Sequence, residues 1–189
     1  MDIAQNKYHQ TREDISLEEA VLRAAMKYPR NFAPIYEKYF LQIFRFVLQR
    51  VEDEDVAGDI TSRVFSKALF KLKDYKFKGL PFSAWLYRVA SNEVNMLFRQ
   101  KQVQRVLNVK TEDLGDMMDE TEGDDKEEKL REMEKSLKKL DLPEMELIEM
   151  RFFERRSFAE MSEIMDITET NARVKTHRVI QKLRQLMKH

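Results

Sequence analysis

Hydrophobic side chains recur every three to four residues through most of the first hundred positions, which is the period of an amphipathic helix. Four such stripes lie within residues 17–25, 35–47, 60–72 and 85–97. The sequence has no convincing run of alternating polar and apolar residues, the pattern typical of a half-buried strand. The pattern therefore predicts an all-α fold that begins with a bundle of about four helices.

Each stripe predicts one buried helix face, formed by Leu17, Val21, Ala24 and Ala25; by Ile35, Tyr39, Ile43, Phe46 and Val47; by Ile60, Val64, Phe65, Ala68, Leu69 and Leu72; and by Trp85, Leu86, Val89, Ala90, Val94 and Leu97. Ser16 and Glu19 have the spacing of a capping box and predict that the first helix begins beside them. Residues 52–55, Glu-Asp-Glu-Asp, precede the third stripe. Because carboxylates stabilise a helix N-terminus, we interpret this run as a helix start.

The last sixty residues divide into shorter helices. Residues 128–140 predict one helix, and a second should begin after Asp141 and run to about Phe153, since Pro143 suits a first turn. Ser157 and Glu160 form another predicted capping box, which opens a short helix ending at Met165.

A tight turn over residues 166–168 should follow, after which Thr168 caps a last helix that runs to about Met187. A short helix, a three-residue turn and a longer helix form the outline of a helix-turn-helix. Asp166 stands near the place of the usual turn glycine, and Asp tolerates the left-handed conformation better than most residues. The predicted core of this motif is Phe158, Ala159, Met161, Ile164, Ile167, Ala172, Val179 and Leu183.

Charge is balanced over the whole chain but not along it. Residues 1–105 hold 18 Lys/Arg against 13 Asp/Glu, residues 106–128 hold 2 against 10, and residues 129–189 hold 14 against 11. The acidic middle segment has two glycines and no aromatic residue, which is typical of a flexible linker. The sequence thus predicts two small helical domains, 1–105 and 129–189, joined by an acidic linker, 106–128.

Several classes of function are disfavoured by composition. The chain has no Cys and only three scattered His, so neither a thiolate nor an H-E-x-x-H metal site can be written. Its four glycines form no phosphate-binding loop, and no nucleophile–base or paired-carboxylate constellation stands out. The polar N-terminus and the absence of a long apolar run predict no signal peptide or membrane span. We expect no catalytic residues, metal or cofactor, and a cytoplasmic location.

The last predicted helix carries a row of cations. Thr170, Asn171, Arg173, Lys175, His177 and Arg178 occupy its first half, with Lys182 and Arg184 further along. Such residues suit phosphates and base edges, although a charged helix face is more often only solvated. The preceding capped helix and turn favour DNA binding.

A second candidate lies between the third and fourth stripes, where Lys76, Phe77 and Lys78 follow Tyr75. Cations that follow a backbone, together with rings on which bases stack, are typical of single-stranded nucleic acid binding. The alternative is that the aromatic rings of this region only pack in the core. We favour that role for Trp85 and leave both roles open for the loop.

These segments resemble the extracytoplasmic-function (ECF) sigma factors of bacterial RNA polymerase over nearly the whole chain. Residues 32–39 are similar to the family's opening helices, residues 55–69 to its A-x-D-hydrophobic-T…V-F…K-A helix, and residues 82–99 to its W-L-x-R-I-A-x-N…R helix. Residues 142–143, 151–152, 157–161 and the last helix match the second domain. Gly58 replaces a common Glu, Met96 stands where an Asp is usual, and the turn glycine is absent.

The resemblance implies a promoter-selecting subunit with bacterial core RNA polymerase, promoter DNA and an anti-sigma factor as partners. It assigns polymerase contact to Asp59, Ile60, Ser62, Arg63 and Phe65. It assigns the single-stranded −10 element to Lys76, Phe77, Lys78, Arg88, Asn92, Asn95 and Arg99. It assigns the −35 duplex to Thr170, Asn171, Arg173, Lys175, His177 and Arg178. The acidic linker would then lie toward the RNA exit path, in a basic channel.

Two other classes of function stay open from the residues alone. A stand-alone helix-turn-helix regulator would dimerise on palindromic DNA without polymerase, but it has no need of a basic aromatic loop. A helical adaptor that binds only proteins would be unaffected by neutralising Arg173, Lys175 and Arg178.

Overall fold

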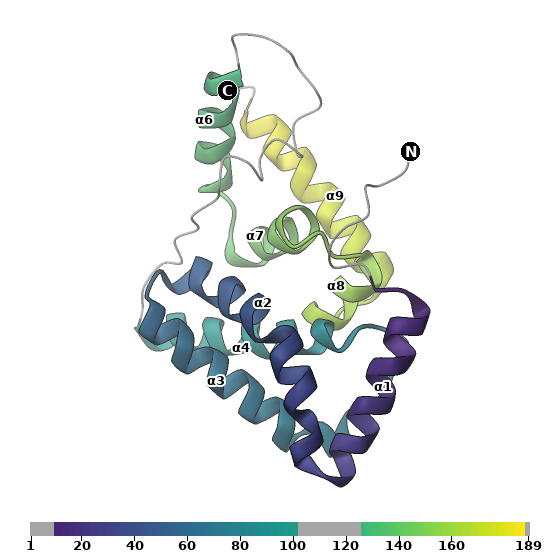
Figure 1. Cartoon of the computed structure of the whole chain (residues 1–189). Helices are drawn as coiled ribbons and strands as arrows, with labels where there is room; N and C mark the ends of the chain where they lie inside the picture. Colours follow the sequence, from purple (N-terminus) through teal and green to yellow (C-terminus); the bar gives the residue numbers. More distant parts are fainter. Residues whose placement is uncertain (1–9, 102–125, 188–189) are drawn as a thin grey trace. The chain divides into compact units, whose positions relative to one another are not determined.

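The computed structural model describes residues 10–101 and 126–187, and all regular elements in these two ranges are helices (Figure 1). The chain divides into two compact units, Met1–Leu107 and Asn108–His189. The predicted all-α class is confirmed. The predicted linker lies outside the described residues except for positions 126–128, which begin a helix. None of the described helices is long and apolar enough to span a membrane.

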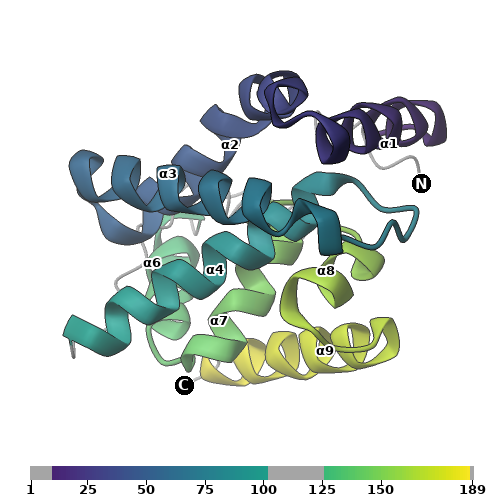
Figure 2. The same cartoon turned by 90° about the horizontal axis from the view of Figure 1, so that it is seen from below.

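The first unit is a bundle of four α-helices. These are α1 (Arg12–Lys27), α2 (Ala33–Val51), α3 (Glu54–Phe70) and α4 (Phe82–Lys101), with the 3-10 turns η1 (Pro29–Phe32) and η2 (Leu72–Asp74) between them. Helices α2, α3 and α4 pack on one another, and α3 and α4 lie side by side in Figure 2. Helix α1 packs on η1, η2 and α2. The predicted helix count of this unit is confirmed.

The core of this unit follows the second predicted stripe closely. Its five residues, Ile35 to Val47 in the order given above, are all at most 2% exposed. The third and fourth stripes are mostly buried as well, with Leu69, Trp85, Val89 and Leu97 only half-buried. Asp53 caps α3 by accepting a hydrogen bond from the backbone N–H of Val56, and Glu54 and Asp55 lie in the first turn. The acidic run therefore stands at a helix start, as predicted.

The start of the first helix was predicted wrongly. Helix α1 begins after Thr11, whose hydroxyl accepts from the Asp14 N–H while the Asp14 carboxylate accepts from the Thr11 N–H. These hydrogen bonds from Thr11 lower the pKa of Asp14. The buried residues of α1 are Glu18, Leu22 and Ala25. Of the predicted stripe, Ala25 is therefore buried, Val21 and Ala24 are half-buried, and Leu17 is 69% exposed. The hydrophobic period alone could not predict this buried face of α1, because one of its positions is occupied by the carboxylate of Glu18.

The second unit contains α6 (Lys126–Leu137), α7 (Leu142–Ile148), the π-helix η3 (Glu149–Phe153), α8 (Phe158–Met165) and α9 (Glu169–Leu186). Asp141, Ser157 and Thr168 cap α7, α8 and α9, each by accepting a hydrogen bond from a backbone N–H three residues on. Asp166 adopts the left-handed conformation at φ 56° between α8 and α9. The predicted caps and helix-turn-helix are confirmed. Of the predicted core, Met161, Ile164, Ala172, Val179 and Leu183 are buried, and Phe158, Ala159 and Ile167 are half-buried.

Candidate nucleic-acid interface

The first half of α9 presents one exposed polar face. The six residues predicted to read duplex DNA, Thr170, Asn171, Arg173, Lys175, His177 and Arg178, are all exposed. The opposite face of the helix holds the buried side chains of Ala172, Thr176, Val179 and Leu183. This division follows from the helical period, since the buried positions recur at intervals of three and four. The structure therefore brings the six candidates onto one helix and leaves them accessible.

These six residues make only weak interactions with the rest of the protein. Arg173 pairs with Glu169 at 3.1 Å, but both side chains are more than half exposed, and such surface pairs contribute little. His177 hydrogen-bonds to Gln181 at 3.0 Å. Lys175 and Arg178 have no ion-pair partner within the described ranges. Their charges are available to a phosphate.

Arg151 was not among the predicted residues, yet it lies beside this face. The guanidinium groups of Arg151 and Arg173 each lie 4.7 Å from the ring centroid of Phe158. Arg151 also donates to the backbone carbonyl of Arg156 at 3.0 Å. Burial and then the charge of Arg173 lower the pKa of Arg151, which stays protonated because an arginine starts so high. Two cations around one ring attract anions to this part of the surface. The sequence did not reveal the pairing because Arg151 lies in η3, far along the chain from Arg173.

Lys182 belongs to the basic row in the sequence, but its ammonium is engaged inside the unit. It donates to both carboxylate oxygens of Glu144, at 2.8 and 2.6 Å, and so links α9 to α7. Partial burial alone raises the pKa of Glu144, but the hydrogen bonds from Lys182 and Asp141 and the charge of Lys182 together lower it. This cation stabilises the fold rather than the interface.

The basic aromatic loop of the first unit connects η2 to α4. Lys76 and Lys78 are exposed in it, and Phe77 is half-buried. Phe77 packs edge-on against Tyr75, with ring centroids 5.1 Å apart, and the guanidinium of Arg23 in α1 lies 4.5 Å above its ring. Gly79 has φ +68°, a left-handed conformation that turns the chain before α4. The loop is therefore shaped by contacts with the rest of the unit.

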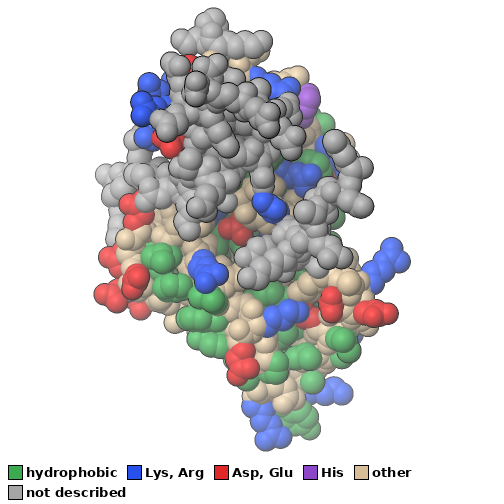
Figure 3. All heavy atoms as spheres, turned by 45° about the horizontal axis from the view of Figure 1, so that its top comes forward, with side chains coloured by type: hydrophobic (Ala, Val, Ile, Leu, Met, Phe, Trp, Pro, Cys, Tyr) green, Lys and Arg blue, Asp and Glu red, His purple; other side chains and the backbone are tan. Residues whose placement is uncertain are grey.

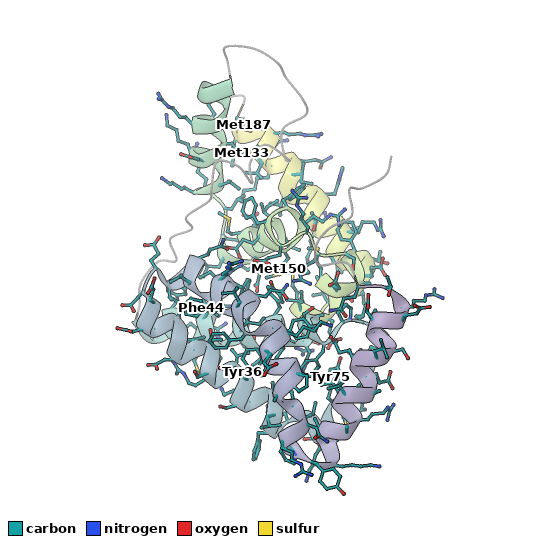
Figure 4. The ribbon with its side chains drawn as sticks, in the orientation of Figure 1. Tyr36, Phe44, Tyr75, Met133, Met150 and Met187 are labelled. Atoms are coloured by element: carbon teal, nitrogen blue, oxygen red, sulfur yellow. The ribbon has the colours of Figure 1, made fainter. Side chains whose placement is uncertain are left out.

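A row of aromatic rings continues from this loop into the core. Tyr75, labelled in Figure 4, contacts Phe82 at 5.1 Å and Trp85 at 5.3 Å. Phe82 is 1% exposed and serves the core. Trp85 is only half-buried, so its predicted core role holds for part of the side chain.

The four candidate residues of α4 share one helix face. Arg88, Asn92, Asn95 and Arg99 are spaced by four, three and four positions, which places them in one stripe. Asn92 and Arg99 are exposed, and Arg88 and Asn95 are half-buried. This stripe begins two turns after the loop, so the loop and α4 can together follow one strand of nucleic acid.

The residues predicted to contact polymerase divide between surface and core. Asp59, Ser62 and Arg63 are exposed on α3, whereas Ile60 is fully buried and Phe65 is 4% exposed. Phe65 packs on the rings of Tyr36 at 4.9 Å and Phe40 at 6.2 Å. Tyr36, labelled in Figure 4, is itself 40% exposed on α2. The accessible part of this candidate surface is thus polar on α3 and aromatic on α2.

Among the residues that the structure describes, no site of another kind stands out. Within residues 10–101 and 126–187, no group of three or more His, Cys, Asp or Glu could hold a metal ion. On the uncovered part of the face shown in Figure 3, Lys and Arg side chains are interspersed with acidic and hydrophobic ones.

Comparison with known proteins matches both units to family models. The model for sigma-70 region 2 matches residues 35–103, and the model for sigma-70 region 4 matches residues 136–185. The first includes the loop and α4, and the second includes the helix-turn-helix.

Two curated relatives align over most of the chain. The ECF RNA polymerase sigma factor BldN of Streptomyces coelicolor is 27% identical over 176 residues, which cover 89% of this chain and 65% of BldN. The ECF RNA polymerase sigma factor SigX of Bacillus subtilis is 23% identical over 163 residues, or 83% of this chain and 84% of SigX. The chain thus spans just under two thirds of the length of the first relative.

Solved structures show the same fold. CnrH, in complex with the cytosolic domain of CnrY, matches with a TM-score of 0.56 at 20% identity, over 89% of this chain and 96% of that one. The sigma factor RpoE in complex with the anti-sigma factor NepR, from Bartonella quintana, matches with a TM-score of 0.57 at 17% identity, over 84% and 98%.

Proposed function

Because this chain belongs to the extracytoplasmic-function sigma factors of the sigma-70 family, we propose that it binds bacterial core RNA polymerase and directs transcription initiation at its own promoters. It acts as a dissociable initiation subunit in the cytoplasm, with no catalysis and no cofactor of its own.

The second unit reads the −35 duplex. Helix α9 enters the major groove with its N-terminal half, where Thr170, Asn171 and Arg173 reach base edges and Lys175 and Arg178 contact phosphates. Arg151 adds a phosphate contact beside Arg173. The exposure of all six α9 residues supports this assignment.

The first unit melts and holds the −10 element. Bases of the non-template strand stack on Phe77, while Lys76 and Lys78 neutralise its phosphates. Arg88, Asn92, Asn95 and Arg99 then guide the strand along α4. The shared face of these four residues supports a continuous path from the loop.

Polymerase is bound through Asp59, Ser62 and Arg63 of α3, with the neighbouring aromatic side chains of α2. The two buried members of the predicted set, Ile60 and Phe65, support this surface from beneath. The acidic segment 106–128 occupies a basic channel toward the RNA exit path, where its charge substitutes for that of a nucleic acid strand. An anti-sigma factor is proposed as a further partner, since CnrH and RpoE were each solved with a protein bound.

The observation that carries this function is the order of two distinct nucleic-acid surfaces on one chain, a loop-and-helix surface and then a helix-turn-helix. Its test is gel filtration of the full chain with bacterial core RNA polymerase at moderate salt, followed by selection of bound fragments from a genomic DNA library. We expect co-elution at about one to one and fragments with two conserved elements. A folded chain that does not bind polymerase but binds palindromic DNA as a dimer would be a stand-alone regulator.

A further inference from the structure

Helix α1 contacts both ends of the loop that precedes α4. The buried carboxylate of Glu18, 5% exposed, accepts three hydrogen bonds from two other elements. Lys38 of α2 donates to it at 2.8 Å, the Tyr39 hydroxyl of α2 donates to the same oxygen, and the backbone N–H of Phe82 donates to the other oxygen at 2.6 Å. Phe82 is the first residue of α4, so a side chain from α1 caps the helix that follows the loop.

Arg23, further along the same helix, reaches the tip of the loop. Its guanidinium lies 4.5 Å above the ring of Phe77. The guanidinium is itself oriented by Glu19, to which it donates at 2.8 and 2.5 Å. An arginine held by a carboxylate one turn away covers one face of the ring, so a base that stacks on Phe77 must use the other face.

Side chains of α1, of the loop and of the start of α4 also line a small pocket. Glu18, Leu22, Tyr75, Phe77 and Phe82 contribute to its wall. The loop therefore packs against α1, and its conformation depends on those contacts. The region 2 match begins at residue 35, so α1 lies outside it.

We propose that α1 is a positioning element for promoter melting: Arg23 sets the orientation of Phe77 for base stacking, and Glu18 anchors the junction between the loop and α4. This inference rests on the proposed role of the loop at the −10 element. In the bound state Arg23, Phe77 and a flipped base form one stack, because guanidinium and base can each lie flat on one face of the same ring.

A double-mutant cycle tests the role of Arg23. Holoenzyme with Arg23→Ala should open the selected promoter about two- to fivefold less efficiently by permanganate footprinting, the effect of losing an exposed cation–π contact. Added to Phe77→Ala, it should cause no further loss, since Arg23 acts through that ring. Lys27→Ala is the matched control, because it removes one charge from the same helix without a contact to the loop.

The outcomes separate the inference from the proposed function. If Phe77→Ala leaves opening unchanged, the loop has no role at the −10 element and the proposed function is wrong at this point. If Phe77→Ala impairs opening but Arg23→Ala matches the Lys27→Ala control, or adds its full effect to Phe77→Ala, the positioning role is wrong.

Glu18 is tested by Glu18→Gln, which keeps the shape of the side chain and one carbonyl acceptor. We expect severalfold faster hydrogen exchange at the Phe82 amide and a similar drop in opening, with binding of core polymerase unchanged. Unchanged Phe82 exchange, or a loss of polymerase binding equal to the loss of opening, would overturn the anchoring role. A circular-dichroism melt of the full chain confirms that the variant is folded.

Discussion

The two proposed nucleic-acid surfaces of this chain are built in different ways. The duplex surface is one regular helix, α9, whose six candidate residues stand exposed on a face set by the helical period. The single-strand surface is a loop whose central ring, Phe77, packs on Tyr75 from its own segment and on Arg23 from α1. The first surface depends on local sequence, and the second depends on tertiary contacts.

This difference has a consequence for substitutions. Removing exposed cations from α9 should change DNA binding and leave the fold intact, because their side chains make only weak contacts with the protein. Changes in or around the loop should alter opening and stability together, since the same contacts serve both.

Replacing Arg173, Lys175 and Arg178 together by Ala should weaken binding of the selected promoter duplex by about two orders of magnitude. The slope of log affinity against log salt should fall by about 2 to 3, since each lost phosphate contact releases about 0.9 fewer counterions. Fluorescence anisotropy of holoenzyme on labelled duplex measures both quantities.

The control replaces Lys135, Lys138 and Lys139, which are exposed in or just after α6, and alters the net charge equally. It should bind like the original chain. Equal losses in the two triple variants would show that net charge, not α9, determines binding.

Phe77→Ala should leave duplex binding unchanged and reduce promoter opening about tenfold, the loss of one base–aromatic stack. Permanganate reactivity of −10 thymines in the open complex measures this. Phe70→Ala, which removes another ring of the first unit that is 87% exposed, is the control. Unaltered footprints would contradict the assignment of the loop to the −10 element. The contrast between a helix surface and a loop surface would then no longer hold.

Sequence reasoning succeeded where structure is local. The caps at Asp141, Ser157 and Thr168 and the left-handed turn at Asp166 are each decided within four residues, so spacing predicts them. The exposed face of α9 follows from the same period. For the helix-turn-helix, the main feature that only the tertiary structure revealed is Arg151, which lies in η3 beside the exposed face of α9.

Sequence reasoning failed where a distant contact decides. The first stripe was expected to bury Leu17, because period and spacing cannot show that Glu18 is buried instead by donors from α2 and α4. The sequence also left the packing of Phe77 open, whereas in the structure Arg23 lies over its ring. Residue types suggested the loop as a candidate site, and only the structure shows that Arg23 of α1 lies over one face of its central ring.

The two described glycines of the first unit should respond oppositely to Ala. Gly79→Ala should destabilise this unit by about 1 kcal/mol, because its φ of +68° is costly for a side chain. Gly58→Ala should stabilise it by about 0.5–1 kcal/mol, since it lies within α3 and a methyl group meets nothing within 4 Å. Urea unfolding followed by Trp85 fluorescence, the only Trp of the chain, measures both. Stabilisation by Gly79→Ala would mean that the loop tolerates a side chain at its turn, and destabilisation by Gly58→Ala would contradict the expected gain in α3.

The smallest effect concerns the bridge that links α7 to α9. Because its hydrogen bonds and the charge of Lys182 lower the pKa of Glu144 in the folded chain, the bridge stabilises the second unit above the ordinary carboxyl pKa of about 4.3. That contribution is lost as pH falls through the lowered value. Glu144→Gln keeps the capping geometry and removes the charge, so it should destabilise α7 and α9 by about 0.5 kcal/mol at pH 7.

Hydrogen exchange of α7 and α9 peptides measures this difference, with each variant compared with the original chain at the same pH. The difference should shrink as the pH falls through the lowered pKa of Glu144, where the carboxylate of the original chain becomes protonated. Glu146→Gln on the same helix, a carboxylate with no ion pair among the described residues, should change exchange little at either pH. A difference for Glu144→Gln that persists unchanged in acid would mean that shape, not charge, joins the recognition helix to its support.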